Sequence, residues 1–144
     1  MNRDELLSQW SAMSEREKHS AVAVDVLGFT HYVGEDVPEA HRHYGEPVDT
    51  LEVWLRGEGP TTERHCKHCG DMPEYTTDHA AAYAVEERIE EMGLRREYYT
   101  ELFTQCEEAE EWWSWMHSWE MIHATPAQRC CAAWVCCKMR EGEK

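Results

Sequence analysis

The sequence has no apolar run that approaches the ~20 residues a membrane-spanning helix needs. Its N-terminal stretch also lacks the apolar core of a secretory signal peptide. Basic residues are few: 14 Lys and Arg stand against 29 Asp and Glu, which gives a formal net charge of −15. A field of that sign repels nucleic acid and anionic membranes. We therefore expect a soluble, intracellular protein with no direct nucleic-acid or membrane partner.

The sequence also lacks the motifs of common catalytic centres. It contains no G-x-S-x-G, no glycine-rich phosphate loop and no H-E-x-x-H. Cys and His are both abundant, so a Cys with a His does not by itself indicate a catalytic pair. Two pairs of cysteines, Cys130-Cys131 and Cys136-Cys137, are neighbours in sequence, and neighbours on a helix point about 100° apart. They indicate reduced thiols rather than a disulfide framework, and no enzymatic activity is predicted.

The clearest element is a helix within the stretch from Tyr75 to Leu94. Thr76, Thr77 and Asp78 are all good N-cap residues, and Gly93 can adopt the left-handed conformation that closes a helix. One side is covered by glutamates, and small or apolar residues recur at helical spacing on the other. The glutamates are Glu86, Glu87, Glu90 and Glu91, and the small or apolar residues are Ala81, Ala82, Val85, Ile89 and Met92.

Three further helices are predicted from capping boxes, in which two side chains three residues apart satisfy first-turn amides reciprocally. The pairs are Asn2 with Glu5, Ser14 with Glu17, and Thr125 with Gln128. The second of these helices is expected to run from about Glu15 to Leu27. The last begins with Pro126, where the missing amide of proline costs nothing.

Strands are predicted at 51–55, at 94–103, and as a hairpin over 112–116 and 119–123. Together these elements predict an α+β fold, an antiparallel sheet with helices packed on it in an α-β-α sandwich. We expect a single domain over residues 1–144, with a loop insertion rich in His and Cys at about 30–72.

Three stretches resemble the signature segments of the phage ABA sandwich domain family. They are V-A-V-D-V-L-G-F at 22–29, P-E-Y-T-T-D-H-A-A-A-Y-A-V-E-E-R-I at 73–89 and A-T-P-A-Q-R-C-C-A-A-W-V at 124–135. The resemblance implies a small bacteriophage-encoded protein with an α+β sandwich, present in the cytoplasm of the infected bacterial host. It supplies no catalytic residue.

Cys66 and Cys69 form a C-x-x-C pair followed by glycine, the spacing with which two thiolates face one metal ion. A structural zinc needs four ligands, and the sequence has no second C-x-x-C. His41 and His43, which share one face of an extended segment, are the expected remaining ligands. The alternative donors are His31, His65 and Cys106. Without a metal, the two cysteines would be free loop thiols or a redox pair.

A binding surface is predicted around Trp112, Trp113 and Trp115. Alternation along a strand places Trp113 and Trp115 on one face and Trp112 on the other. One face can fill the core, and the other is covered by helices or provides an aromatic platform, an oligomer interface or a ligand stack. Arg95, Arg96 and Arg129 are the basic residues expected to hold an anionic ligand in a concave pocket.

Three functions are compatible with these features. The first is a non-enzymatic phage accessory protein for counter-defence or host takeover, which assembles as a homo-oligomer and sequesters a host protein or a small nucleotide-like immune signal. The second is an acidic mimic of nucleic acid that inhibits a basic host protein. The third, a metal-dependent enzyme, would need an open coordination position and a general base. A continuous acidic face would indicate mimicry, and a concave pocket with arginines would indicate ligand capture.

Overall fold

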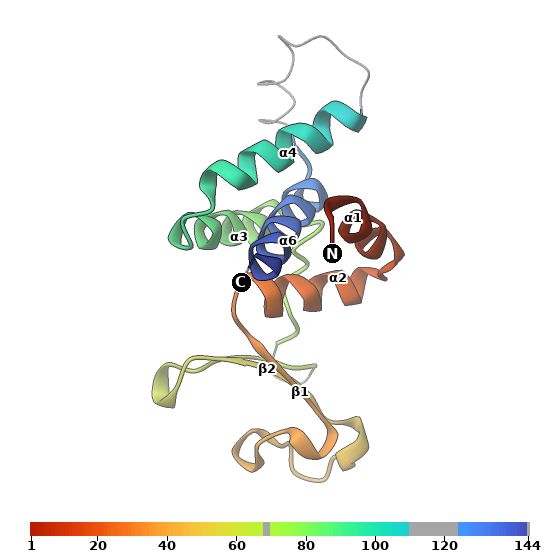
Figure 1. Ribbon diagram of the computed structural model, residues 1–144. Helices are drawn as coiled ribbons and strands as arrows, with labels where there is room; N and C mark the ends of the chain where they lie inside the picture. The colour runs from red at the N-terminus through yellow and green to blue at the C-terminus, as the bar shows by residue number, and fades with distance from the viewer. Residues whose placement is uncertain (68–69, 110–123, 144) are drawn as a thin grey trace. The chain divides into compact units, whose positions relative to one another are not determined.

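The computed structural model describes residues 1–67, 70–109 and 124–143 (Figure 1). The chain divides into two compact units, Met1–Leu27 with Pro73–Lys144, and Gly28–Met72. The α-helices lie in the first unit and a three-stranded antiparallel sheet lies in the second, so the predicted α+β class is confirmed. Within the described ranges, no helix is long and apolar enough to cross a membrane.

The three predicted capping boxes are all present. They begin helix α1 (Arg3–Ala12), helix α2 (Glu15–Ala21) and helix α6 (Pro126–Gly142). The helix expected from Glu15 to Leu27 is also present, but it changes to a π-helix, η1 (Val22–Val26), in which the Leu27 amide donates to the Val22 carbonyl at 3.0 Å. Gly28 follows with a φ of 81°, which an L side chain rarely adopts.

The predicted central helix is confirmed as α3 (His79–Glu91). The Asp78 carboxylate accepts hydrogen bonds from the amides of Ala80 and Ala81, and Gly93 closes the helix with a φ of 72°. Of the expected apolar face, Ala82, Val85 and Ile89 are buried.

The strand predicted at 94–103 is wrong, because helix α4 (Arg95–Ala109) occupies this stretch. Leu94, Tyr98 and Leu102 are buried, and residues four apart share a face both on a helix and on a strand. The intervening Arg96 and Thr100 are exposed, which fits only the helical period. The predicted tryptophan hairpin at 112–123 lies outside the described residues.

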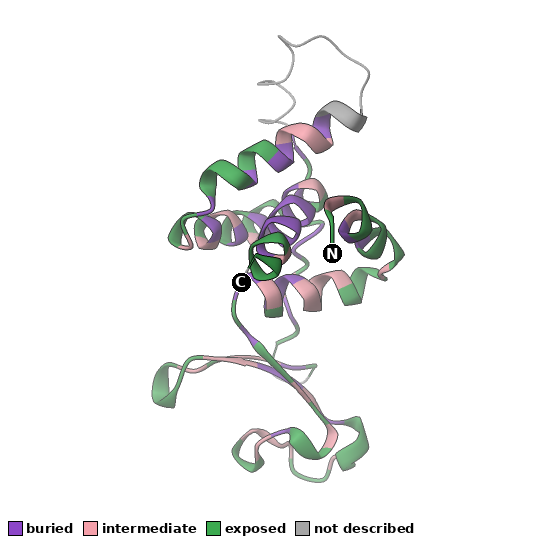
Figure 2. Ribbon diagram, in the orientation of Figure 1, coloured by how far each residue is buried: buried purple, intermediate pink, exposed green. Residues whose placement is uncertain are grey.

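Helix α6 lies in the middle of the first unit, with α1, α3, α4 and η1 packed around it (Figures 1 and 2). All of its residues from Arg129 to Cys137 are buried. Most of these side chains are Cys or Ala, whose small size lets neighbouring helices approach closely. Its Trp134 ring lies 5.5 Å from Trp10 and donates its indole N–H to Asp25 at 2.8 Å. The helices thus bury their apolar faces mainly against α6 rather than against a sheet.

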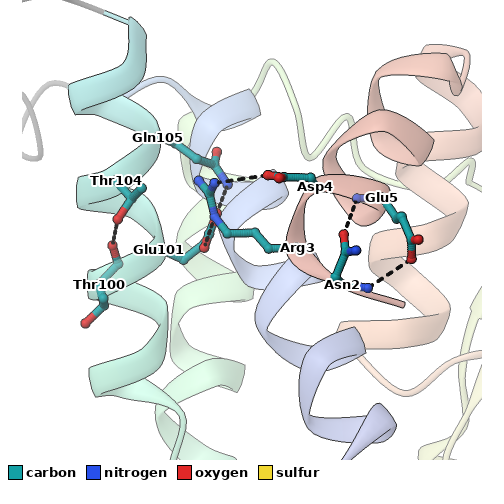
Figure 3. Close-up of polar contacts among 8 residues, drawn as sticks. All are labelled: Asn2, Arg3, Asp4, Glu5, Thr100, Glu101, Thr104 and Gln105. Carbon is teal, nitrogen blue, oxygen red and sulfur yellow. Dashed lines mark hydrogen bonds and ion pairs between the residues drawn. The ribbon is translucent and has the colours of Figure 1, made fainter.

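Helix α1 is tied to α4 by a buried ion pair (Figure 3). The Arg3 Nε donates to both carboxylate oxygens of Glu101, at 3.0 and 2.9 Å, and the Gln105 amide donates to the same carboxylate at 3.0 Å. Glu101 is only 7% exposed, so these donors replace the water it loses.

The second unit is built on strands β1 (Thr30–Val33), β2 (Glu52–Arg56) and β3 (Glu63–His65), paired in that order. The predicted strand at 51–55 is confirmed as β2. The other two were missed because most of their residues are exposed or half-buried and give no apolar alternation. Val37, Leu51, Val53 and Cys66 form a small core. Four short helices connect these strands: η2 (Gly34–Asp36), η3 (Glu39–His41), η4 (Val48–Thr50) and η5 (Gly59–Thr61).

Candidate functional site

A hollow of about 410 Å³ lies beside α3 and α4, with Arg129 of α6 also lining it. We call it the α3/α4 hollow. Successive turns of α3 supply glutamates and a tyrosine to its wall, and the first turns of α4 supply two tyrosines and an arginine. These residues are Tyr83, Glu86, Glu87, Glu90, Arg95, Tyr98 and Tyr99.

A largely buried ion pair lines the inner wall of the hollow. The Arg129 Nη1 donates to both oxygens of Glu86, at 2.9 and 3.0 Å, and its Nε donates to the Ala124 carbonyl at 3.1 Å. The Tyr98 hydroxyl donates to the same Glu86 carboxylate at 3.0 Å. The Arg129 and Glu86 side chains are only 11% and 16% exposed.

Burial and neighbouring charge shift the protonation equilibria of this inner wall. Burial raises the pKa of Tyr98, and the adjacent Glu86 carboxylate raises it further. Burial alone would lower the pKa of Arg129, but the attraction of Glu86 and Tyr98 outweighs it and the pKa is raised. Tyr98 is therefore a neutral donor and Arg129 a fixed cation, and neither is suited to exchange protons near neutral pH.

The outer wall is open to solvent. Tyr83 and Tyr99 are 56% and 39% exposed. The Arg95 Nη1 lies 3.5 Å from a Glu90 oxygen, and its guanidinium carbon lies 5.9 Å from the centre of the Tyr99 ring. Glu87 is exposed and has no hydrogen-bond or ion-pair partner in the described part of the chain. The hollow contains one more carboxylate than guanidinium, and its two cations both have carboxylate partners.

Arg96, the second predicted anion-binding arginine, lines a different hollow. Neighbours on a helix point about 100° apart, and Arg96 faces a space of about 710 Å³ beside α4 and the last turns of α6. Leu94, Cys136 and Met139 provide the apolar lining of this second hollow, and Arg140 is the other basic residue in it. Of the three predicted arginines, the structure therefore brings Arg95 and Arg129 into one hollow and places Arg96 in another. Trp112, Trp113 and Trp115 lie outside the described residues, so the aromatic surface stays a prediction.

Three of the predicted zinc ligands, Cys66, His41 and His43, lie in the described part of the second unit. The His43 Nε2 lies 3.4 Å from the Cys66 Sγ, and Cys66 and Gly70 exchange two backbone hydrogen bonds of 3.0 and 3.1 Å. Cys69 lies outside the described residues. The backbone carbonyl of His41 accepts a hydrogen bond from the Arg64 Nη2 at 2.9 Å.

The Cys66 to His43 distance fits two ligands of one zinc ion. With Zn–S of ~2.3 Å and Zn–N of ~2.05 Å, two tetrahedral ligands lie about 3.6 Å apart. The Arg64 Nη2 approaches the same atoms, at 3.1 Å from the His43 Nε2 and 3.8 Å from the Cys66 Sγ. A bound metal would have to displace this guanidinium. No group of three or more His, Cys, Asp or Glu side chains suited to a metal was found among the described residues.

The alternative zinc donors have other contacts. The His31 ring stacks on Trp54 with 4.4 Å between ring centres, and its Nε2 lies 3.1 Å from a Glu52 oxygen. The His65 ring lies against Phe29, 5.2 Å away, and Cys106 is buried on α4 in the first unit. Among the four histidines proposed as donors, all of them in the described residues, it is His43 whose ring contacts the Cys66 thiol.

The cysteines of α6 have the character of core residues. Burial raises the pKa of Cys130, Cys131 and Cys136 to about 12, and that of Cys137 to about 11. These thiols are therefore protonated at neutral pH, and the protonated form is a poor nucleophile and metal ligand.

Comparisons of the chain with protein-family models, with curated proteins and with solved structures gave no match. The relation to the phage ABA sandwich family stays a prediction from the three stretches at 22–29, 73–89 and 124–135.

The α3/α4 hollow was not predicted from the sequence. Glu86, Glu87 and Glu90 were assigned to the solvent face of the central helix, which is correct for two of them. Tyr98 and Tyr99 were placed on a strand, so their position beside these glutamates was not foreseen. The spacing of Leu94, Tyr98 and Leu102 gave no signal for the hollow, because residues four apart share a face both on a helix and on a strand.

Proposed function

We propose that this protein is a non-catalytic binding protein whose α3/α4 hollow takes up a basic segment of a partner protein. The observation that carries the proposal is the charge arrangement of the hollow. Its two arginines are matched by Glu86 and Glu90, while Glu87 has no partner among the described residues. Tyrosine rings lie beside these carboxylates, and a ring face attracts a cation.

The whole-molecule field favours the same class of partner. A net charge of −15 accelerates the approach of a basic protein and slows that of an anion. A nucleotide-like ligand, the other predicted partner, would need cations free to bind phosphate. In the α3/α4 hollow both guanidiniums already have carboxylates beside them, so that ligand gains little there. The second hollow has Arg96 and Arg140 but also three glutamates, so it offers a nucleotide-like ligand no excess of positive charge either.

The biological setting we propose follows from the sequence resemblance. A phage-encoded protein in the cytoplasm of its bacterial host would meet many basic nucleic-acid-binding proteins. Occupying their cationic surface would serve host takeover or counter-defence without catalysis. The acidic side chains then act as a substitute for phosphates, which joins the binding-protein and mimicry hypotheses.

The test is a fluorescence-anisotropy titration with a labelled arginine–glycine peptide at physiological salt. Glu87→Lys should weaken binding about tenfold, because it places a cation beside the peptide's own, within about one Debye length. Asp4→Lys makes the same change in net charge on an exposed residue of α1 that does not line the hollow, and should weaken binding less than about twofold. Equal effects of the two variants would show that only the overall charge acts, and would refute the proposal.

We also propose a structural zinc in the second unit, held by Cys66, Cys69 and His43, with His41 as the fourth ligand. The 3.4 Å contact between Cys66 and His43 supports this assignment. Metal binding would add order to a unit whose own core is small. Its ligands must lose protons, so affinity should fall as the pH drops through the histidine range.

Elemental analysis of reduced protein, purified without chelator, should find about one zinc per chain. Cys66→Ser should abolish it. The matched variant Cys136→Ser, which changes a core thiol of α6, should retain it. Absence of zinc from the unaltered protein would return Cys66 and Cys69 to the status of ordinary thiols.

A further inference from the structure

Arg95, which lines the α3/α4 hollow, lies at a helix position that is unfavourable for a cation. Arg95 and Arg96 are the first two residues of α4. The N-terminus of a helix carries a partial positive charge, so two arginines there weaken the helix slightly. Helix stability therefore does not explain these side chains.

Arg95 is held only loosely in the hollow. Its side chain is 70% exposed, and so is 67% of its partner Glu90, with 3.5 Å between the nearest atoms. Exposed ion pairs and exposed cation–π contacts are both weak. Arg129 differs in every respect, since it makes two hydrogen bonds to Glu86 and a third to the Ala124 carbonyl and is almost fully buried. Of these two guanidiniums, Arg95 alone is free to leave.

We propose that Arg95 occupies the position of a partner's arginine, and that the partner displaces it on binding. This inference rests on the proposed function and names the group that the hollow recognises. A guanidinium is planar and can lie over the Tyr99 ring while it pairs with Glu90; that of Arg95 lies 5.9 Å from the ring centre and 3.5 Å from a Glu90 oxygen. The incoming arginine would gain the same two contacts, and the unpartnered Glu87 carboxylate on the same wall is a third acceptor.

If a partner's side chain displaces Arg95, the hollow should bind arginine more tightly than lysine. An ammonium is a compact, strongly hydrated charge without a flat face, so it gains less from the tyrosine ring. Arg95 would then lower the affinity of the hollow for its ligand, because in the free protein it occupies the position beside Glu90 and Tyr99 that the ligand must take. Its removal frees the position and also removes a like charge.

The test compares Arg95→Ala with Arg96→Ala. The two residues are neighbours on α4 and both variants change the net charge equally, but Arg96 lines the second hollow. Arg95→Ala should bind the labelled arginine–glycine peptide about fivefold more tightly than Arg96→Ala does, and the gain should be smaller for a lysine–glycine peptide of the same length. Circular dichroism of both variants checks that α4 is intact.

The outcomes separate this inference from the proposed function. If Glu87→Lys weakens peptide binding but Arg95→Ala and Arg96→Ala bind equally, the hollow is the site and the displacement of Arg95 is refuted. Weaker binding by Arg95→Ala than by Arg96→Ala would also refute it, because Arg95 would then contribute to the complex. If binding does not respond to Glu87→Lys, the proposed function itself fails.

Discussion

Replacing Glu86 by Gln tests the inner wall of the α3/α4 hollow most directly. The substitution keeps the size of the side chain and an oxygen for the Tyr98 hydroxyl, but removes the negative charge beside Arg129. The guanidinium would then be an uncompensated charge with only 11% of its side chain exposed. Moving Arg129 outward would cost its hydrogen bond to the Ala124 carbonyl.

The size of the effect follows from burial. Removing one partner of a fully buried ion pair costs about 3–5 kcal/mol, and the remaining exposure of this pair places the expected loss near the lower end, at about 3 kcal/mol. With a urea m-value of about 1.5 kcal/mol per molar, the midpoint of unfolding should fall by about 2 M. Such a loss is a large part of the ~5–15 kcal/mol that stabilises a typical domain.

The assay is urea denaturation followed by circular dichroism in the helical band, because the α-helices all belong to the first unit. Glu87→Gln is the matched control: it removes the same charge from the next residue of α3, where the side chain is exposed. Its stability should change by less than about 0.5 kcal/mol. Equal midpoints for Glu86→Gln and Glu87→Gln would refute the reasoning, since the ion pair would then contribute nothing.

Three further predictions concern the first unit. Thr125→Ala removes half of a capping box and should lower the free energy of unfolding by about 1 kcal/mol, so an unchanged urea midpoint would contradict it. Val85→Asp puts an unpaired charge at a fully buried position and should prevent folding. A soluble Val85→Asp protein that unfolds cooperatively would contradict the burial of this position. Burial raises the pKa of Cys130 to about 12, whereas a thiol in the unfolded chain has a pKa of about 8.5. The contribution of this thiol to the free energy of unfolding should therefore be complete below about pH 8.5 and should decline as the pH rises towards 12. Constant stability across that range would contradict it.

Local chemistry was sufficient to predict several elements. A capping box satisfies first-turn amides with side chains three residues away, so Asn2, Ser14 and Thr125 each define a helix start without reference to the rest of the fold. The same holds for Gly93 at the end of α3, whereas at its start the structure selected Asp78 from three candidate caps, Thr76, Thr77 and Asp78. The two partners of each capping box are only three residues apart, so the interaction can be predicted from the sequence alone.

The predicted zinc ligands show an intermediate case. The C-x-x-C spacing identified Cys66 and Cys69, and the spacing of His41 and His43 named these two histidines as the expected further ligands. The sequence could not show how near their rings lie to Cys66. Only the tertiary structure places the His43 ring beside the Cys66 thiol.

The sequence by itself determined the starts of α1, α2 and α6, the end and the buried face of α3, the β2 strand and the strongly acidic character of the protein. Only the tertiary structure decided that residues 95–109 form a helix, since burial at every fourth position fits either period until the exposure of Arg96 and Thr100 is known. It also decided that Glu86 meets Arg129, 43 positions away, and that Arg95 and Arg96 line separate hollows. The physical reason is that a cap or a turn depends on neighbours along the chain, whereas a pocket depends on which helix faces pack together, and that choice is made by burial across the whole unit.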